Sequence, residues 1–352
     1  MSISESYPPA FRCAINDGIP SATAEIEPVL VQDKDIDIPV IDFEGLDKEI
    51  LTEACRDWGI FRLKNHGVPL ALTSQLQEIS ESLLSLPFEN KQKLFAAVNS
   101  PLAYFWGTPA LNRSGDALKR GAHQASNVSK VEGFNVPLSK LPASTSCDDD
   151  DDDARHSELE SFRVLIKEYG RHIARIAVTL FEAIALTLNL ELSSDQRSEY
   201  LLESTGLIRV YRYPPSDKTA GEALGMEVHT DSSVISVLKE DETGGLEIMK
   251  DEEWFRVKPV ADTLIVNLGD MMQAISDNEY KSVKHRVKKK DMTTQRHSVC
   301  YFVFPQRDCV IKSSNYKPFT YSEFEAQVQA DVQSLGTKIG LPRFAPESPL
   351  FL

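Results

Sequence analysis

The sequence predicts an α+β protein whose C-terminal half is mainly β and is backed by helices. Two observations support this prediction. Beyond Ser204, short runs rich in β-branched and aromatic residues alternate with turns. Ahead of them, between Glu158 and Leu190, apolar residues recur at three- and four-residue steps, the strongest helical pattern in the chain. Many evenly spaced short strands favour a sandwich or barrel, with the long helix packed against it.

The N-terminal region, residues 36–200, is predicted to be mostly helical with short strands. A flexible arm over residues 1–35 precedes it, because this stretch is rich in Ser, Pro and acidic residues and has no sustained period. A helix that starts at Ala71 is expected to end at Leu86, because a residue that precedes a proline is pushed out of the helical region. The expected elements are a strand at Ile38–Phe43, a helix at Lys48–Asp57, a strand at Trp58–Leu63, a turn at Asn65–Pro69 and a helix at Ala71–Leu86.

Two segments of this region are expected to lack regular structure. From Asn99 to Pro142, Gly, Pro, Ser and Asn recur, which predicts a long irregular segment. Six consecutive aspartates, Asp148–Asp153, lie within a predicted disordered acidic loop over residues 143–156. Like charges repel and nothing apolar is available for burial. A calcium site is disfavoured because the spaced ligands and the bend glycine of an EF-hand loop are absent.

The β-rich core is predicted over residues 201–310, followed by a C-terminal helix and tail over residues 311–352. The final helix is expected at about Tyr321–Ser334, ending ahead of Gly336, a residue that commonly follows a helix end. The expected strands are Leu207–Tyr213, Val234–Leu238, Leu246–Met249, Trp254–Pro259, Leu264–Leu268 and Ser298–Phe304.

The charge balance argues against a nucleic-acid-binding protein. The chain carries 38 Lys and Arg against 53 Asp and Glu, a formal charge of −15, whereas such proteins usually need a basic face to displace counterions from phosphate. The only dense basic run, Lys288–Lys290, is expected to be a solvated turn. With 41% hydrophobic and 26% charged residues, the composition is that of a globular protein.

The sequence also predicts a cytoplasmic monomer that does not contact membranes. No stretch approaches the roughly 18–20 consecutive apolar residues of a membrane helix, and residues 1–12 lack the basic-then-apolar order of a secretory signal. The cysteines are odd in number and contain no CxxC pair, which indicates free thiols in a reducing compartment. They are Cys13, Cys55, Cys147, Cys300 and Cys309.

Three side chains in the β-rich half have the pattern of a metal site. His229 and Asp231 are two residues apart, so on an extended segment they project to the same side. His285 follows 54 residues later and would have to be returned by a neighbouring strand. Two imidazoles and one carboxylate on one face of an ion are typical of non-haem Fe(II) oxygenases and leave coordination positions open. The same ligand types also suit zinc, so a zinc hydrolase stays an alternative. His172, beside the apolar stripe of the long helix, is expected to be structural.

A second group could hold a carboxylate. On a strand, Arg296 and Ser298 share a face while His297 points the other way, so the guanidinium and the hydroxyl could bind one carboxylate by charge-assisted hydrogen bonds. Tyr213 offers another hydroxyl if its strand lies beside that of Arg296. The alternative for Arg296 is an exposed strand residue paired with a glutamate.

Taken in order, His229, Asp231, His285, Arg296 and Ser298 resemble the plant 2-oxoglutarate- and Fe(II)-dependent dioxygenases, which include gibberellin oxidases, flavonoid oxidases and ethylene-forming oxidases. Two departures are Tyr211 in place of the family's common Asn, and Ser216-Asp217 where Cys-Pro often follows the proline pair. The resemblance covers nearly the whole chain, and its supporting segments are Ile38–Asp42, Ala54–Pro69, Leu86-Pro87 with Lys91, Gly225 before the His229 motif, Gly244–Leu246, Asn267–Asp270 and Tyr280–Val287.

The resemblance implies a distorted double-stranded β-helix, or jelly roll, flanked by helices and binding iron at its open end. It implies that His229, Asp231 and His285 bind Fe(II), and that Arg296, Ser298 and Tyr213 bind the distal carboxylate of 2-oxoglutarate. The co-substrates would be 2-oxoglutarate and O₂, with ascorbate in support. Oxidative decarboxylation of 2-oxoglutarate would yield succinate and CO₂ and oxidise a C–H bond of the substrate.

The resemblance also suggests the substrate: a small, largely apolar plant hormone or specialised metabolite, with a gibberellin-type diterpenoid acid as the first expectation. Met271–Ala274 either lines the pocket or forms a packed core strand. The alternatives are an ascorbate-dependent oxidase of the ethylene-forming type and a non-catalytic protein that senses a small ligand. Candidate partners for a substrate carboxylate are Arg113, Lys119, Arg120 and Arg212, and candidate apolar walls are Tyr104, Phe105, Trp106 and Phe304.

Overall fold

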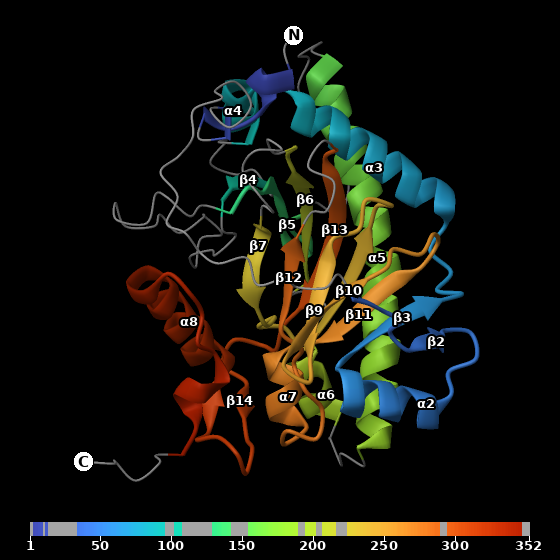
Figure 1. Cartoon of the computed structure of the whole chain (residues 1–352), viewed down its shortest axis with the longest axis vertical. Coiled ribbons are helices and arrows are strands. Elements are labelled where there is room, and N and C mark those ends of the chain that lie inside the picture. The colour runs from blue at the N-terminus through green and yellow to red at the C-terminus, as the bar shows by residue number, and fades with distance from the viewer. Residues whose placement is uncertain are drawn as a thin grey trace.

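Two β-sheets face each other and enclose an apolar cluster to which both contribute (Figure 1). The computed structural model describes residues 3–9, 11–12, 34–95, 102–107, 129–141, 154–188, 194–201, 206–215, 224–288 and 294–346. Neighbouring strands run antiparallel, except β2 with β3 and β1 with β10, which are parallel. This is the predicted α+β fold with a core like a double-stranded β-helix.

The strands come from distant parts of the chain. In spatial order, the larger sheet consists of β2 (Val40–Asp42), β3 (Ile60–Lys64), β11 (Leu264–Leu268), β8 (Ile235–Glu240), β13 (Arg296–Val303), β6 (Leu207–Tyr213), β5 (Glu132–Pro137) and β4 (Ala103–Trp106). The smaller sheet consists of β1 (Asp35–Ile36), β10 (Glu253–Val257), β9 (Leu246–Lys250), β12 (His285–Lys288) and β7 (Leu224–His229). A separate pair joins β14 (Val310–Ile311) to β15 (Phe319–Thr320).

Helices flank the sheets, and the longest of them covers the outer side of the larger sheet (Figure 1). The helical elements are a 3₁₀ turn at Ile3–Ser6, α2 (Lys48–Glu53), a π-helical turn at Ala54–Trp58, α3 (Leu70–Ser85), α4 (Phe88–Phe95), a 3₁₀ turn at Leu138–Lys140, α5 (Ala154–Thr187), α6 (Ser194–Tyr200), α7 (Asp270–Ile275), α8 (Tyr321–Leu335) and a 3₁₀ turn at Leu341–Phe344. The predicted C-terminal helix is confirmed. Thr320 and Glu323 form a capping box at its start, and Gly336 follows its end with a φ of 79°.

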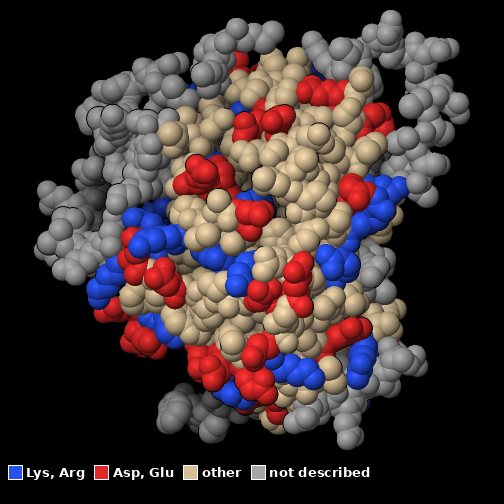
Figure 2. Space-filling model, turned by 90° about the vertical axis from the view of Figure 1, so that its right-hand side faces the viewer, with Lys and Arg blue, Asp and Glu red and all other residues tan. Residues whose placement is uncertain are grey.

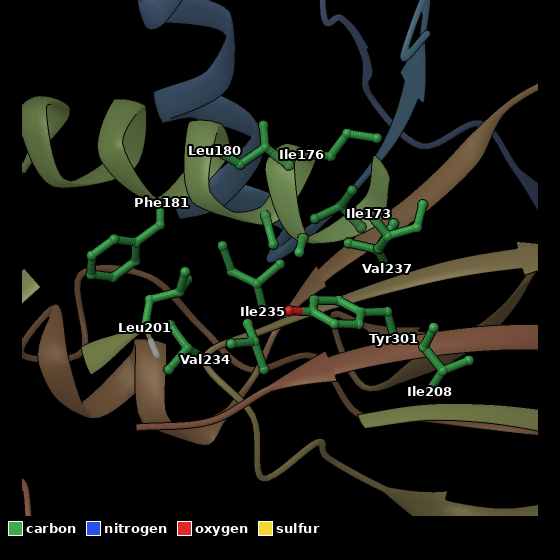
Figure 3. Packing of buried hydrophobic residues seen from close by; sticks show 14 of the residues in the cluster. Ile173, Ile176, Leu180, Phe181, Leu201, Ile208, Val234, Ile235, Val237 and Tyr301 are labelled. Carbon is green, nitrogen blue, oxygen red and sulfur yellow. The ribbon is translucent and has the colours of Figure 1, made fainter. Parts of the chain in front are cut away.

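Side chains along each strand of the larger sheet point alternately to an inner face, toward the smaller sheet, and to an outer face. On β13, Cys300 and Phe302 belong to the cluster between the sheets, whereas Tyr301 and Val303 belong to the cluster on the outer side, as expected for side chains that alternate with a period of two. Helix α5 covers the outer side, and its apolar residues pack against β8, β13 and β6 (Figure 3). The inner face is therefore left for the site.

The acidic loop prediction overlaps the start of α5. Residues 154–156 belong to that helix, so the prediction of disorder to residue 156 is wrong at this end. Residues 143–153, with the six aspartates, lie outside the described residues.

The predicted irregular segment at 99–142 contains two strands, β4 and β5, which extend the larger sheet beyond β6. Gly133 shows why the composition was misleading. A Cβ at this position would meet the backbone oxygen of Val210 at 1.8 Å, so the sheet requires glycine where the strands approach closely. The glycine that suggested a loop is thus a condition for strand pairing.

The start of the predicted flexible arm is packed onto the larger sheet. Tyr7 is 1% exposed, and the guanidinium carbon of Arg212 lies 4.2 Å from the centre of its ring. Phe11 is buried and meets Trp106 edge-on. The arm prediction is therefore wrong for residues 3–9 and 11–12. It is also wrong at residue 35, which belongs to β1, whereas residues 13–33 lie outside the described residues.

Arg212 holds this packing together from the outer face of β6. Its Nε donates to Glu132 Oε1 at 2.8 Å, and Lys91 Nζ donates to Glu132 Oε2 at 2.6 Å. Tyr104 also donates its hydroxyl hydrogen to Glu132 Oε2, at 2.5 Å. All three charged side chains are buried. Arg212 is thus neither a substrate ligand nor a solvated cation, because its strand position turns it away from the inner face.

Acidic and basic side chains interleave on the face in Figure 2, which shows no continuous basic area. Among the described residues, no helix is long and apolar enough to cross a membrane. Cys55, Cys300 and Cys309 are buried free thiols, as predicted, whereas Cys13 and Cys147 lie outside the described residues.

Candidate functional site

The three predicted metal ligands meet at one end of the smaller sheet. His229 is the last residue of β7 and His285 the first of β12, and the register of these strands pairs the two residues directly. Asp231 lies just beyond the end of β7, and its Oδ1 is 3.8 Å from the Nε2 of each histidine. The ligand atoms of the three residues lie within 4.8 Å of one another. This is the only such group of three among the described residues, and it has the ligands of a facial triad.

The backbone and neighbouring side chains orient these ligands toward one point. His229 Nδ1 lies 2.7 Å from the carbonyl oxygen of Glu227, and His285 Nδ1 lies 3.1 Å from that of Val283. A proton on each Nδ1 satisfies these carbonyls and leaves both Nε2 lone pairs free for a metal. The residues therefore fit a divalent ion without rearrangement of the rings.

Two donors from the larger sheet hold the carboxylate. Ser236 Oγ and Asn267 Nδ2 donate to Asp231 Oδ2 at 2.7 and 2.6 Å, which leaves Oδ1 toward the histidines. Ser236 lies on β8 and Asn267 on the adjacent β11, where they are paired in register. Neither residue was predicted as part of the site, although the Asn267–Asp270 segment was noted.

Burial and charge favour the protonation states that a metal requires. Burial and, after it, the neighbouring His285 lower the pKa of His229 to about 3, so that this imidazole is neutral at physiological pH. Burial alone would raise the pKa of Asp231, but the two histidines and its two hydrogen-bond donors outweigh burial and lower it. Asp231 is thus an anion that faces the neutral imidazole of His229.

Asn267→Ala is expected to weaken Fe(II) binding by about 10- to 100-fold, the usual cost of losing a partner that orients a ligand. The measurement is an anaerobic titration of the protein with Fe(II), in which calorimetry gives the affinity. Asn315→Ala is a matched control, because Asn315 Nδ2 also donates to a carboxylate, Asp277 Oδ1 at 3.0 Å, but does so at the surface. Equal Fe(II) affinities for both variants would contradict the role of Asn267.

The predicted carboxylate-binding residues also come together. β13 pairs with β6 so that Arg296 is opposite Tyr213, and the Arg296 guanidinium carbon lies 4.9 Å from the centre of the Tyr213 ring. Arg296 Nη1 donates to Ser298 Oγ at 3.0 Å. Burial raises the pKa of Tyr213 to about 12, although Arg296 opposes this, so the phenol keeps its proton as a donor. All three residues are at most 4% exposed.

Arg296 is not an exposed strand residue, but it is paired with a glutamate. It is buried on the inner face, yet its Nη2 donates to Glu240 Oε2 at 3.0 Å. Glu240 was not predicted, and no local pattern marks it, because it reaches Arg296 only through the pairing of β8 with β13. That Arg296, Ser298 and Tyr213 bind 2-oxoglutarate stays a prediction.

An apolar cluster lies between the sheets beside these groups. Of the predicted walls, Phe105 belongs to it and Phe304 packs against it, but Tyr104 turns toward Phe134 and Trp106 is 37% exposed. The members of this inner cluster are Phe105, Val131, Tyr211, Tyr213, Val287, Cys300 and Phe302, with Met226, Leu238 and Phe304 packed against them.

Other substrate-pocket predictions fail or fall outside the described residues. Met271 and Met272 are fully buried in the outer cluster and lie on α7, so the Met271–Ala274 segment neither lines the inner cluster nor forms a strand. Arg113, Lys119 and Arg120 lie outside the described residues. The predicted structural histidine, His172, is partly buried and faces Glu168 one turn earlier on α5.

The fold and the three ligands define an iron-dependent oxygenase, and the comparison with known families agrees. Residues 204–305 match the 2OG-Fe(II) oxygenase superfamily, and residues 38–145 match the N-terminal region of the non-haem dioxygenases of morphine synthesis. The chain belongs to the 2OG-Fe(II) oxygenase superfamily. It is an Fe(II)- and 2-oxoglutarate-dependent dioxygenase, so the zinc hydrolase, the ascorbate-dependent oxidase and the ligand sensor are not retained.

Individual relatives cover most of the chain. Gibberellin 2-beta-dioxygenase 6 of rice is 34% identical over 331 residues, which are 89% of this chain and 86% of the relative. Gibberellin 2-beta-dioxygenase 8 of Arabidopsis thaliana is 33% identical over 342 residues, 92% of this chain and 89% of the relative. The structure of JOX2 in complex with 2OG, Fe and JA has the same fold, with a TM-score of 0.70 at 24% identity over 94% of this chain and 96% of JOX2.

Proposed function

We propose that this dioxygenase hydroxylates a gibberellin-type diterpenoid acid, or a similar small apolar plant acid. Four relatives between 30% and 34% identical to this chain are gibberellin 2-beta-dioxygenases. Fe(II), held by His229, Asp231 and His285, would supply the oxidising chemistry, while the protein binds and orients the substrate and excludes water. Location in the cytoplasm and a monomeric state stay predictions.

The observation that carries this proposal is an arginine among the aromatic side chains of the inner face. Arg209 alternates along β6 with the outward residues, so it shares the inner face with Tyr211 and Tyr213. It is partly exposed, and its guanidinium carbon lies 5.3 Å from the centre of the Phe302 ring. An apolar wall suits a hydrocarbon skeleton, and a cation suits its carboxylate.

Asn135 adds a second donor at the same place. Asn135 is opposite Arg209 in the register of β5 and β6, and Arg209 Nε donates to its Oδ1 at 2.9 Å. Asn135 is 2% exposed, and its Nδ2 finds no hydrogen-bond partner in the part of the chain that the structure describes. Because a buried donor without a partner is costly, an acceptor group of the substrate would stabilise this arrangement. Arg209 thus takes the role that the sequence had suggested for Arg212.

The test of the reaction is incubation with Fe(II), ascorbate, 2-oxoglutarate and a panel of gibberellins, with a plant metabolite extract in parallel. Mass spectrometry should find a gibberellin product heavier by one oxygen, with one succinate released per product. If a different acid from the extract is hydroxylated instead, that acid is the substrate in place of a gibberellin. Turnover of neutral compounds only would refute the proposal of an acid substrate.

Arg209→Gln is expected to raise the KM for the acid by tenfold or more, equivalent to about 1.4 kcal/mol or more, because the substrate carboxylate loses its charged partner. The methyl ester of the same acid provides the control within one experiment. The wild type should prefer the acid to the ester, and the variant should lose this preference while still oxidising the ester. An unchanged preference would show that the carboxylate binds elsewhere.

A further inference from the structure

Glu240 is a buried acid in direct contact with the proposed co-substrate anchor. It is the last residue of β8, and the register pairs it with Ser298 on β13. Its Oε2 accepts a hydrogen bond from Arg296 Nη2 at 3.0 Å, and its side chain is 5% exposed. A carboxylate that bound Arg296 and Ser298 together would therefore lie next to Glu240.

Arg296 is held by three partners, whereas Glu240 is only half satisfied. The Arg296 Nε donates to the carbonyl oxygen of Gly244 at 2.6 Å, and Nη1 donates to Ser298 Oγ at 3.0 Å. These bonds fix the guanidinium plane against the sheet. The second oxygen of Glu240, Oε1, is buried and has no hydrogen-bond partner among the described residues. An ionised carboxylate with an unpartnered buried oxygen is costly, and a protonated one costs less.

The charged groups around Glu240 come from four strands or their ends. Arg296 on β13 and Arg62 on β3 are the cations, Asp241 directly follows Glu240 beyond the end of β8, and the Tyr213 phenol on β6 lies beyond Arg296. Arg62 is committed elsewhere, since it donates to Thr263 Oγ1 and to the carbonyl oxygen of Lys258. Burial raises the pKa of Glu240, and both arginines together do not reverse this effect.

Binding of 2-oxoglutarate would bring another anion to this group. The charges of Fe(II) and Arg296 balance those of Asp231 and the doubly charged co-substrate, so an ionised Glu240 would leave one excess negative charge in a buried site. When two carboxylates share one site, the pKa of one of them rises strongly, because both cannot ionise at low cost. Arg296 cannot neutralise both acids.

We propose that Glu240 takes up one proton from solvent when 2-oxoglutarate binds, and that its neutral carboxyl group then donates a hydrogen bond within the anchor. The proton makes Glu240 a donor beside the new carboxylate instead of a competing anion for Arg296. By linkage, the affinity for 2-oxoglutarate falls as pH rises, by up to about tenfold per pH unit while one proton is taken up. This inference rests on the proposed role of Arg296 and Ser298, and it does not depend on the identity of the substrate.

The experiment is calorimetry of 2-oxoglutarate binding to the Fe(II)-loaded protein under argon, without substrate. Binding heats in buffers of different ionisation enthalpy give the number of protons taken up. The wild type should take up close to one proton between about pH 7 and 8.5, with a Kd that rises across this range. Glu240→Gln, which preserves shape and supplies a neutral donor, should take up none. At the upper pH, its Kd should be at least tenfold lower than that of the wild type.

Asp331→Asn is the matched control. Asp331 is also a buried acid paired with an arginine, Arg343 Nη2 at 2.9 Å, but it lies on α8 outside the anchor. This variant should keep the proton uptake and the pH dependence of the wild type. Absence of proton uptake by the wild type, or equal uptake by Glu240→Gln, would overturn the inference. Both results can be obtained whether or not any gibberellin is a substrate.

Discussion

His229→Ala and Asp231→Ala are each expected to abolish turnover, because each removes one of the three side chains that bind Fe(II). The loss should exceed the roughly 10- to 100-fold cost of removing a partner behind a ligand, since here the ligand itself is lost. The measurement is succinate release together with Fe(II) affinity. His172→Ala is the control, because this histidine lies on α5 outside the site.

The two variants should differ in stability. His229→Ala removes a neutral ring at the end of a strand, whereas Asp231→Ala leaves the buried donors Ser236 and Asn267 without their acceptor. An unsatisfied buried donor costs about 1–3 kcal/mol, so the metal-free Asp231→Ala protein should unfold at a lower denaturant concentration than the His229→Ala protein. Retained turnover in both variants would refute the metal assignment.

Arg296→Ala is expected to weaken 2-oxoglutarate binding by about 2–5 kcal/mol, the usual cost when a buried charge loses its partner. This corresponds to roughly 30-fold to several thousand-fold in Kd. The measurement is calorimetry with the Fe(II)-loaded protein, and Arg343→Ala is the control arginine. An unchanged Kd for 2-oxoglutarate would remove Arg296 from the anchor.

Arg296→Ala is expected to have a second effect, because Arg296 also pairs with Glu240. It leaves Glu240 buried without its cation, which destabilises the anchor independently of the lost contact with 2-oxoglutarate. The double variant Arg296→Ala with Glu240→Gln removes both charges. It should fold more stably than the single variant but still bind 2-oxoglutarate weakly, because no cation faces the distal carboxylate.

Elements that depend on the spacing of residues close together in the sequence could be predicted well. Helix α5 follows from apolar residues at three- and four-residue steps, and the strands around Leu207–Tyr213 and Leu264–Leu268 follow from short β-rich runs. The three metal ligands could also be identified, because His229 and Asp231 lie two residues apart and His285 adds the second imidazole. Apart from His285, which lies 54 residues beyond Asp231, these features need only a few neighbouring residues.

Which sheet face a side chain lies on, and which strands pair, were harder to predict. The choice of Arg212 as a substrate ligand, however, could have been corrected from the sequence. Arg209 and Tyr213 are four residues apart on one strand, so a period of two already places them on the same face and Arg212 on the other. Strands β4 and β5 were missed for a different reason. Gly133 weakens any isolated strand, and it is favourable only because β6 lies close enough to exclude a Cβ.

The amino-acid order alone therefore established the class of protein, the helices and core strands, and the chemical types gathered at the iron site. Folding in three dimensions decided which distant groups meet. Glu240 reaches Arg296, and Asn267 reaches Asp231, only because β8 lies between β11 and β13 in one sheet. Periodicity reports which side of an element is buried, but hydrogen bonding between strands that are far apart in the chain sets the partners, and no short pattern encodes that register.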